Sequence, residues 1–555
     1  MNLDPLLVLL LKFLGQTNKP IFLTGKAGTG KTTFLHYLKT NLSKNYAVVA
    51  PTAVAAINAG GVTINSFFQM PFGPFLPNDS NAIPSSRPVS QEKMKLLQCL
   101  DLLIIDEISM VRADTLDYID TTLRQTRGSI RPFGGVQLLM IGDLYQLPPV
   151  YQNDWTVLKN LYKGPYFFDS LVLKKMSLTT FELTQVYRQK DPVFIDILNS
   201  IRNGHVESEM LANLNANYNP SLNTNWLTDY VTLSTHNQLV NDINRLRLDE
   251  LITTAYTFKA TITGDFQKES YPTEEELVLK KGAQVMFIKN DSSGKKQYYN
   301  GRTARVTTID QERIRLTFLD DKTEFDVVPE IWQSVKYSLS ESEKKVTESN
   351  AGSFTQYPLK LAWAITIHKS QGLSFDKAII DVDAAFAHGQ TYVALSRCRT
   401  LEGLMLKSPV RPENISTDPL IVHFMKNAVR AIPDETLLDE ATIELERDVL
   451  ADVFNFSVLK DAWLAVRQFI VESESSEHKI REQVLKVDLL IKNGIAKIGK
   501  QFINQEIIVI PKEENIWYSE VIISRIRKAA SFFLPKLLEF RGLFCLLVNI
   551  FLQPE

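Results

Sequence analysis

The stretch IFLTGKAGTGKTTF, residues 21–34, combines residue types that bind phosphate. It contains the pattern G-x-x-x-x-G-K-[ST] between an apolar run that predicts a strand and a segment that predicts a helix. Backbone N–H groups of such a loop turn toward phosphate oxygens, Lys31 would reach the β and γ phosphates, and Thr32 would ligate Mg²⁺. A glycine turn that binds nothing is the alternative, which this context disfavours. The predicted phosphate-binding residues are Gly25, Lys26, Ala27, Gly28, Thr29, Gly30, Lys31, Thr32 and Thr33.

Two further polar groups follow predicted strands. LLIIDEIS ends an apolar strand in Asp106 and Glu107. Asp106 would hold Mg²⁺ together with Thr32, and Glu107 would orient and deprotonate the attacking water. A solvated turn is the alternative for an isolated Asp-Glu pair, but the buried strand before it favours the catalytic interpretation. In MIGDLYQLPPV, Gln146 either senses the γ phosphate or lies in a proline-stiffened turn, and the spacing leaves both open.

The elements that must position these residues follow from the hydrophobic pattern. Residues 1–250 alternate short β-branched runs with helical patterns, which is typical of a parallel sheet covered by helices. Prolines and aromatic residues interrupt this alternation at 66–97, and short strands and turns at 255–350 predict a small β barrel. The parallel-sheet pattern then resumes at LAWAITIHKS, so we expect two α/β lobes with a cleft between them. Beyond about residue 430 the chain is charged and helical, without a recognised motif.

Composition limits the classes of protein that the chain can form. Its 555 residues exceed one hydrophobic core, and a hydrophobic content of 45% is ordinary for a globular protein. The net charge of −2 does not by itself indicate a polyanionic partner, although a basic groove can lie on a neutral protein. Cys99, Cys398 and Cys545 lie too far apart for a zinc ribbon, an iron–sulfur cluster or a disulfide framework. Because neither terminus carries a signal-peptide or membrane-spanning pattern, we expect a protein of the reducing cytoplasm, or of the nucleus in a eukaryote.

Nine motifs in a fixed order, over roughly residues 20–410, resemble the Pif (petite integration frequency) family of superfamily-1B DNA helicases, with RecD-like relatives next. They are GKAGTGKT, APTAVAAINAGGVTINSFF, IIDEISM, GGVQLLMIGDLYQLPPV, LTQVYRQ, KGAQVMFIKND, YYNG, LKLAWAITIHKSQGLSFD and TYVALSRCR. The segment at 113–128 resembles the helix that is specific to Pif, and it is also amphipathic, with Leu116, Ile119 and Leu123 on one face.

The resemblance implies an activity and its requirements. It implies an ATP- and Mg²⁺-dependent helicase that moves 5′ to 3′ on single-stranded DNA and unwinds tailed duplexes, with folded G-rich DNA as a further substrate. DNA repair, recombination, replication and telomere maintenance are the processes that such enzymes serve. Two alternatives remain open from the residues: a translocase that remodels complexes without separating strands, and an inactive nucleotide-binding scaffold.

The resemblance also implies roles for individual residues. Arg188 in VYRQ and Arg397 in ALSRCR would enter the nucleotide cleft from the second lobe as arginine fingers, and Gln371 and Gly372 would lie near the nucleotide. Short polar side chains bind phosphates without reading sequence, and aromatic rings stack on any base. The implied DNA contacts are Thr52, Asn65, Ser66, Phe67, Thr366, His368 and Lys369. Core packing is the alternative for Phe67, and internal hydrogen bonding is the alternative for Thr52 and His368.

The resemblance also assigns segments of the chain to domains, and a few residues differ from the family pattern. Phe72, Phe75 and Pro77 would be pin residues of the wedge, and residues 431–555 would brace the protein, bind a protein partner or add a DNA contact. Asn65 stands where the family has His, Ala304 where Gly is common, and no clear adenine-reading glutamine precedes the phosphate loop, because Gln16 lies close to it. The expected organisation of this monomer is a first RecA-like lobe (1–65 and 98–180), a wedge insertion (66–97), a second RecA-like lobe (181–254 and 351–430), an SH3-like β insertion (255–350) and a helical extension (431–555).

Overall fold

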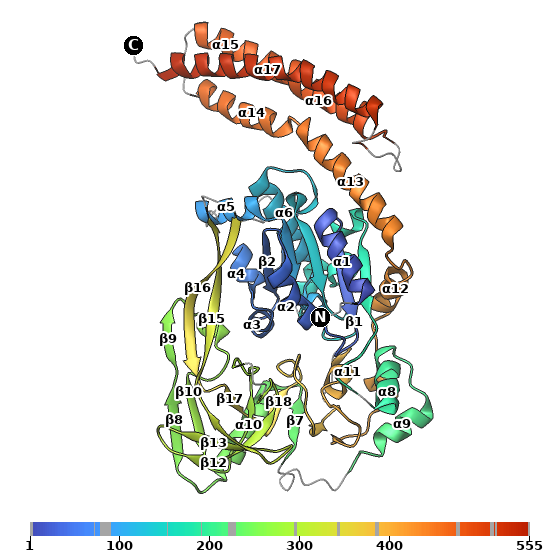
Figure 1. Cartoon of the computed structure of the whole chain (residues 1–555), viewed down its shortest axis with the longest axis vertical. Helices are drawn as coiled ribbons and strands as arrows, with labels where there is room; N and C mark the ends of the chain where they lie inside the picture. The colour runs from blue at the N-terminus through green and yellow to red at the C-terminus, as the bar shows by residue number, and fades with distance from the viewer. Residues whose placement is uncertain are drawn as a thin grey trace. The chain divides into compact units, whose positions relative to one another are not determined.

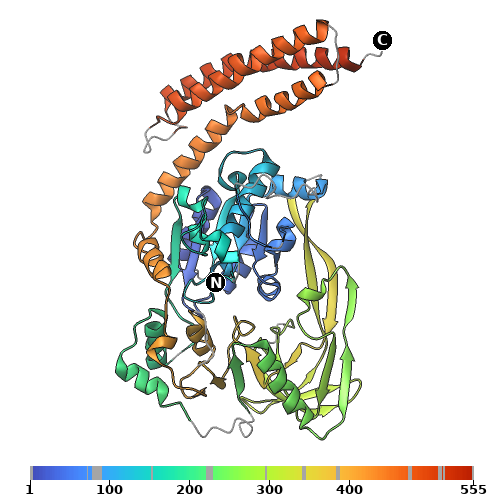
Figure 2. The same cartoon turned by 180° about the vertical axis from the view of Figure 1, so that it is seen from behind.

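The structure is a computed structural model, shown in Figure 1 and from behind in Figure 2. It divides into two compact units: a main unit of residues 20–127 and 131–432, and a helical unit of residues 1–19, 128–130 and 433–555. The residues that the structure describes are 4–71, 73–77, 90–151, 154–189, 191–219, 229–293, 297–340, 345–382, 388–472, 478–510, 516 and 519–552.

The first lobe of the main unit is built on a parallel sheet of six strands. Their order is β3 (Val62–Thr63), β2 (Tyr46–Ala50), β4 (Leu102–Ile105), β5 (Gln137–Ile141), β1 (Ile21–Gly25) and β6 (Thr179–Leu183). Carboxyl ends of parallel strands meet at one edge of a sheet, so the loops after β1, β4 and β5 converge there. That edge therefore collects the phosphate loop, the Asp106–Glu107 pair and Gln146.

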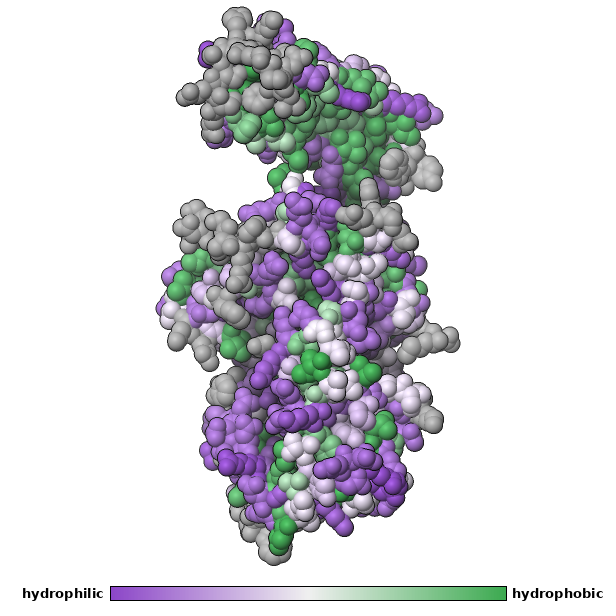
Figure 3. All heavy atoms as spheres, turned by 90° about the vertical axis from the view of Figure 1, so that its left-hand side faces the viewer, coloured by the Kyte–Doolittle hydropathy of each residue, from purple (hydrophilic) through white to green (hydrophobic). Residues whose placement is uncertain are grey.

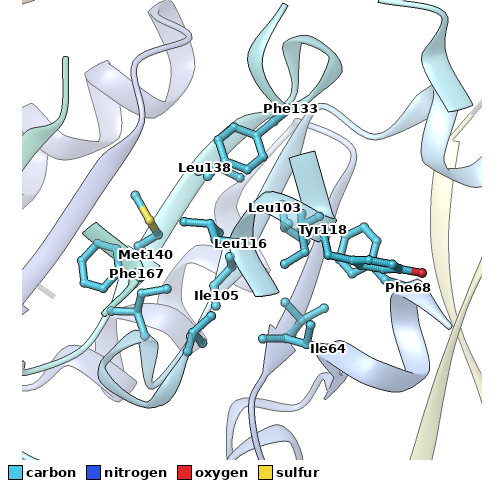
Figure 4. Close-up of a cluster of buried hydrophobic side chains, with 14 of the residues drawn as sticks. Ile64, Phe68, Leu103, Ile105, Leu116, Tyr118, Phe133, Leu138, Met140 and Phe167 are labelled. Carbon is cyan, nitrogen blue, oxygen red and sulfur yellow. The ribbon is translucent and has the colours of Figure 1, made fainter. Parts of the chain in front are cut away.

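Helices cover this sheet because its strands are apolar on both faces. They are α2 (Lys31–Asn41), α3 (Ala53–Ala59), α4 (Ile64–Phe68), α5 (Gln91–Cys99), α6 (Ala113–Arg127) and the short α7 (Trp155–Leu158). Figure 4 shows the core between the sheet and α6, where Leu116 faces Ile105 and Met140 from the strands. Leu116, Ile119 and Leu123 are all buried, which confirms the amphipathic helix predicted at 113–128. Packing on this side fixes the strand ends that carry the polar residues.

The second lobe has a parallel sheet of four strands, as the resumed pattern predicted. Their order is β18 (Ala364–Thr366), β7 (Val231–Ser234), β19 (Ala378–Ile380) and β20 (Leu404–Leu406). The helices of this lobe are α8 (Pro192–Arg202), α9 (Ser208–Asn215), α10 (Asn237–Asp249) and α11 (Gln390–Leu395). α12 (Pro419–Ala428), which lies in the range predicted for this lobe, packs instead on the core of the first lobe, where Phe424 stacks on Phe168 at 4.2 Å. Two α/β lobes interrupted by a β module confirm the predicted fold class.

The β module between β7 and β18 is antiparallel. One sheet has the order β14 (Glu324–Val327), β13 (Ile314–Phe318), β12 (Thr303–Ile309), β11 (Gln284–Phe287) and β17 (Leu359–Leu361). The others pair β10 (Glu276–Lys280) with β8 (Ala255–Lys259), and β15 (Glu330–Ser340) with β16 (Lys345–Gln356) and β9 (Thr261–Gly264). Ala304 of β12 pairs with Val285 of β11. Its φ is not positive, so alanine is tolerated where the family commonly has glycine.

The long hairpin formed by β15 and β16 reaches α5 of the first lobe (Figures 1 and 2). The Tyr337 hydroxyl accepts the Val48 N–H at 2.9 Å, and its ring packs edge-on against Phe67 at 5.6 Å. Lys39 and Glu348 form an ion pair at 3.3 Å, and the Val346 N–H donates to Asn45 at 3.0 Å. This docking, which the sequence analysis did not predict, covers part of the first lobe.

The helical unit contains the helices predicted beyond residue 430. They are α13 (Glu435–Val453), α14 (Ser457–Glu472), α15 (His478–Leu489), α16 (Lys497–Phe502) and α17 (Glu520–Leu552), with a π-helical stretch at Leu490–Ala496. α1 (Pro5–Gln16) contacts α13, and ion pairs join Lys12 to Glu435 and Lys19 to Glu444. The N-terminal helix, which the sequence analysis assigned to the first lobe, therefore groups with the C-terminal helices. None of the helices in the described ranges is both long and apolar enough to cross a bilayer.

Only part of the predicted wedge can be described. Phe72 and residues 78–89 lie outside the described residues. Phe75 is 5% exposed, packs edge-on against Tyr118 at 5.3 Å, and its N–H donates to Asp114 at 2.9 Å. A side chain that separates DNA strands must be exposed. Phe75 is buried by packing instead, so its predicted role as a pin residue is wrong. Pro77 is half-buried.

Candidate nucleotide and DNA site

The phosphate loop follows β1 and opens α2, as the motif requires. Gly28 and Gly30 have φ values of 80° and 89°, which favour glycine. A Cβ on Gly28 would lie 2.4 Å from the Arg188 Cβ, so only glycine lets the second lobe approach this closely. The Lys31 ammonium donates to the carbonyls of Gly25 and Lys26 at 2.6 and 3.0 Å, and burial lowers its pKa. A buried ammonium with these two partners can also bind phosphate oxygens.

The carboxylate pair lies at the same edge of the sheet. Asp106 accepts the Glu107 N–H at 3.0 Å, and Glu107 has φ of 51°, a strained conformation typical of functional sites. Burial raises the pKa of both carboxyl groups, and the charge of Asp106 raises that of Glu107 further. Thr32 is exposed at the first turn of α2. A hydroxyl and a carboxylate are oxygen ligands of the kind that Mg²⁺ prefers, so the residues present fit this ion.

The second lobe contributes three side chains to this edge. Gln371 donates to Glu107 at 2.9 Å and to the Gln146 amide oxygen at 3.4 Å. Arg188 donates to the Gly372 carbonyl at 3.4 Å, and its Nη1 is buried without a hydrogen-bond partner among the described residues. Burial, with the nearby charge of Arg188, lowers the pKa of Arg397 to about 9. The predicted catalytic and nucleotide-binding residues of both lobes therefore lie together.

Arg397 is held by its own lobe. It is 1% exposed, and its guanidinium donates to the Val393 and Leu373 carbonyls at 2.9 and 3.4 Å and to the Ser396 hydroxyl at 2.9 Å. Gln189 ties the two arginine motifs together, because its amide donates to the Ser396 and Cys398 carbonyls at 3.0 and 3.2 Å. The packing places the two guanidinium groups on one rigid part of the second lobe.

The raised pKa of Glu107 leads to a prediction about pH. The pKa is raised from 4.5 to about 7 chiefly by burial. A carboxyl group with a raised pKa stabilises the folded state while it is protonated, and this contribution is lost as the pH rises through about 7. Glu107→Gln should therefore raise the melting temperature of the nucleotide-free protein at about pH 8 but not at about pH 5. It should also reduce ATP hydrolysis about 10²-fold or more, which phosphate release measures. Equal pH dependence of melting in both proteins would contradict the assignment.

The predicted DNA contacts of the first lobe differ in exposure. The Thr52 hydroxyl accepts the Ala55 N–H at 3.2 Å and caps α3. Asn65 and Ser66 are exposed on α4, whereas Phe67 is 2% exposed. Phe67 packs against Phe68 and Tyr337, and the Lys93 ammonium lies 3.6 Å from its ring centroid. A base can therefore stack on Phe67 only if the hairpin and Lys93 move away.

A groove of about 670 Å³ adjoins these residues. The first lobe contributes Ser66 and Lys93 to its lining, and the hairpin contributes Lys336 and Tyr337. Burial and the charge of Lys336 lower the pKa of Lys93 to about 8. The first-lobe wall of this groove brings polar and cationic side chains together without base-specific geometry, which suits a nucleic-acid backbone.

The predicted DNA contacts of the second lobe follow β18. The buried Thr366 hydroxyl accepts the Lys369 N–H at 3.3 Å, and Lys369 itself is exposed. His368 is half-buried, and burial lowers its pKa. The pKa of Lys360 on β17 is lowered by burial and by the charge of Lys369. The roles of Lys369, Asn65 and Ser66 as phosphate contacts remain predictions, and all three residues are exposed.

Three residues of the site were missed by the sequence analysis. Asp143 is fully buried and accepts a hydrogen bond from Arg202 of α8 at 3.0 Å, and the Tyr392 hydroxyl of α11 accepts the Ala27 N–H at 3.2 Å. Asp143 lies three residues before Gln146 in MIGDLYQLPPV, so its position directly after the strand β5 could have indicated it. Arg202 and Tyr392 lie far along the chain, and no spacing indicates them.

This fold and site define a P-loop nucleotide-hydrolase architecture with two RecA-like lobes, in which the second lobe completes a nucleotide site begun by the first. Residues 11–211 match the profile of the PIF1-like helicase family, and residues 437–542 match that of the DNA helicase middle domain. The chain belongs to the PIF1-like helicase family. The second match lies in the C-terminal segment, where the sequence analysis recognised no motif.

Individual relatives agree with this assignment. The ATP-dependent DNA helicase Pif1 of Psychrobacter is 32% identical, over 79% of this chain and 72% of that protein. Human PIF1 is 34% identical over 73% of this chain, which spans 60% of the human protein's length. The crystal structure of a Bacteroides Pif1 with ADP-AlF4 is 41% identical, covers 77% of this chain and 97% of its own, and has a TM-score of 0.72. Bound to single-stranded DNA, the Bacteroides protein has a TM-score of 0.55 at 42% identity and the same coverage.

Proposed function

We propose that the protein is an ATP-dependent DNA helicase that translocates 5′ to 3′ on single-stranded DNA and unwinds tailed duplexes. One observation carries the proposal: the second lobe places Arg188, Arg397 and Gln371 against the phosphate loop and the carboxylates of the first lobe. Such a site is complete only when the lobes close, so hydrolysis can drive relative movement of two DNA-binding surfaces. We infer the 5′-to-3′ direction of movement from membership of the PIF1-like helicase family.

The residues divide the hydrolytic work. Lys31 and the loop N–H groups bind the phosphates, while Gln371 and Gln146 orient Glu107 and the water beside it. Glu107 accepts the proton as water attacks the γ phosphorus and the bond to the β–γ bridging oxygen breaks. Arg188 and Arg397 neutralise the charge that develops on the transferred group. Thr32 and Asp106 would hold Mg²⁺, which would supply further neutralisation of the phosphate charge when bound.

The docked hairpin supports a separate step for DNA entry. The structure resembles the Bacteroides protein more closely with ADP-AlF4 or unliganded, at TM-scores of 0.72 and 0.70, than with single-stranded DNA, at 0.55. Tyr337 and Lys93 cover Phe67 in this arrangement. We infer that single-stranded DNA takes the place of the hairpin, so that Ser66 and Phe67 become available to the strand.

This inference predicts that weakening the hairpin dock tightens DNA binding. Tyr337→Ala removes the hydroxyl that accepts the Val48 N–H and the ring that covers Phe67. Loss of about 1 kcal/mol from the docked state should increase affinity for single-stranded DNA about fivefold, provided that the docked state predominates without DNA. Fluorescence anisotropy with a labelled oligonucleotide measures the change. Val328→Ala, an exposed residue next to the hairpin, is the control. Unchanged or weaker binding by Tyr337→Ala would contradict the inference.

Two measurements test the proposed function. ATP hydrolysis should rise when single-stranded DNA is added, and duplexes with a 5′ tail should be unwound faster than duplexes with a 3′ tail. Hydrolysis without unwinding of either substrate would favour a translocase that remodels complexes. Absence of hydrolysis with DNA present would favour the inactive scaffold.

The helical unit gives this protein an additional surface. On the face shown in Figure 3, hydrophobic atoms gather on this unit. We propose that it braces α1 through the contacts with α13, and that its apolar surface binds a protein partner. We further propose a monomer associated with DNA in the cytoplasm, or in the nucleus of a eukaryote. The large apolar residues exposed in this unit include Val449, Val453, Phe469, Leu485, Val521, Leu534 and Leu538.

A further inference from the structure

A chain of hydrogen bonds crosses between the lobes and ends at Glu107. Arg202 of the second lobe donates to Asp143 of the first lobe at 3.0 Å, and Gln146 donates to the other Asp143 oxygen at 3.3 Å. Gln371 of the second lobe then donates to Gln146 at 3.4 Å and to Glu107 at 2.9 Å. Arg202 starts this chain, although it belongs to none of the nine motifs.

The local packing fixes the position of Arg202. It is the last residue of α8, whose N-terminus is capped by Asp191 and whose Phe194 and Ile197 are buried in the core of the second lobe. The Arg202 side chain is 6% exposed, and its guanidinium lies 4.1 Å from the ring centroid of Tyr145. Arg202 therefore presents a cation to the first lobe from a rigid helix rather than from a loop.

Asp143 depends on this cation. Its side chain is fully buried against the Arg202 guanidinium, and breaking such a buried pair by removing one partner is strongly destabilising. Without Arg202, Asp143 would no longer hold Gln146 in place.

We propose that Arg202 is a positioning residue for ATP hydrolysis. Its bond to Asp143 holds Gln146 and, through Gln371, Glu107 in the hydrolytic arrangement. Contact between α8 and the loop after β5 thus couples closure of the two lobes to the position of Glu107. This inference rests on the proposed function, because it assigns Arg202 a part in the same reaction.

The test separates turnover from binding. Arg202→Gln should lower the DNA-stimulated kcat about 10- to 100-fold, because a small misplacement of catalytic groups has effects of this size. The affinity for ADP, measured with a fluorescent analogue, should change less than about threefold, since the phosphate loop itself is intact. Arg202→Lys should restore part of kcat because it restores the charge. Asp143→Asn should resemble Arg202→Gln, and the double variant should be no worse than either single variant.

A matched control distinguishes positioning from stability alone. Arg112 forms another such pair with the fully buried Asp114, at 2.6 Å, and the partners of its side chain among the described residues, Gly73, Asp114 and Asp154, lie outside the nucleotide site. Arg112→Gln should lower the melting temperature and leave kcat of the folded protein unchanged. If Arg202→Gln proves insoluble, Arg202→Lys and Asp143→Asn carry the same test.

Three results would overturn the inference. The first is a kcat of Arg202→Gln equal to that of Arg112→Gln. The second is a fold-loss of kcat in the double variant equal to the product of the two single losses, and the third is a loss of ADP affinity as large as the loss of kcat. Failure of the inference is distinguishable from failure of the proposed function. The unaltered protein would hydrolyse ATP with DNA in the first case and would not do so in the second.

Discussion

Lys31→Ala is expected to reduce DNA-stimulated ATP hydrolysis about 10³-fold and to abolish unwinding. The Lys31 ammonium is buried, its pKa is lowered by burial, and its recorded partners are two carbonyls of the phosphate loop. The two carbonyls hold this ammonium at the phosphate loop, and removal of such a preorganised donor has an effect of this order. Phosphate release with saturating single-stranded DNA measures the loss. Binding of single-stranded DNA should persist, because Lys31 does not lie among the predicted DNA contacts.

Lys44→Ala is the matched control for Lys31. Lys44 is also a partly buried lysine of the first lobe with a pKa lowered by burial, but it donates to Gln137 at the amino end of β5, opposite the nucleotide site. Its loss should leave kcat within about twofold, as for substitutions away from functional features. If Lys31→Ala and Lys44→Ala had the same activity, the phosphate site would not be where the fold places it.

Arg188→Ala is expected to lower kcat about 10³-fold, the effect typical of an arginine finger. The Arg188 Nη1 is buried without a partner among the described residues, and its backbone approaches Gly28 so closely that only glycine fits. An unpaired buried donor beside the phosphate loop is placed for an anion that is absent until nucleotide binds. Stopped-flow measurement of phosphate release gives kcat, and ADP binding should change little, because the finger acts on the transferred group.

Two variants sharpen the test of Arg188. Arg188→Lys should recover only part of kcat, since an ammonium cannot reproduce the planar fork of donors. Arg313→Ala removes an arginine from a half-exposed ion pair with Asp326 on the β module and should leave hydrolysis unchanged. Activity of Arg188→Ala within about threefold of the unaltered protein would show that Arg188 does not act as an arginine finger.

Local patterns determined the first half of the nucleotide site. The phosphate loop, Asp106, Glu107 and Gln146 each follow a predicted strand, and parallel strands bring such residues to one edge of a sheet. The sequence was therefore sufficient to predict the first lobe's contribution and the presence of two lobes. The roles of Arg188 and Arg397 came from motif order, because an arginine in a loop has no local signal that separates catalysis from a surface ion pair.

Contacts between distant segments were decided by the tertiary structure alone. Arg202 meets Asp143, and Tyr392 meets Ala27, across long stretches of chain. Hydrophobic periodicity states which face of α8 is buried but not which lobe its last residue reaches. Phe75 and α1 were misassigned for the same reason, since burial and partner choice depend on what packs nearby. Local sequence thus determined the chemistry at the strand ends, whereas the assembly of the two lobes around it depended on packing that no short motif encodes.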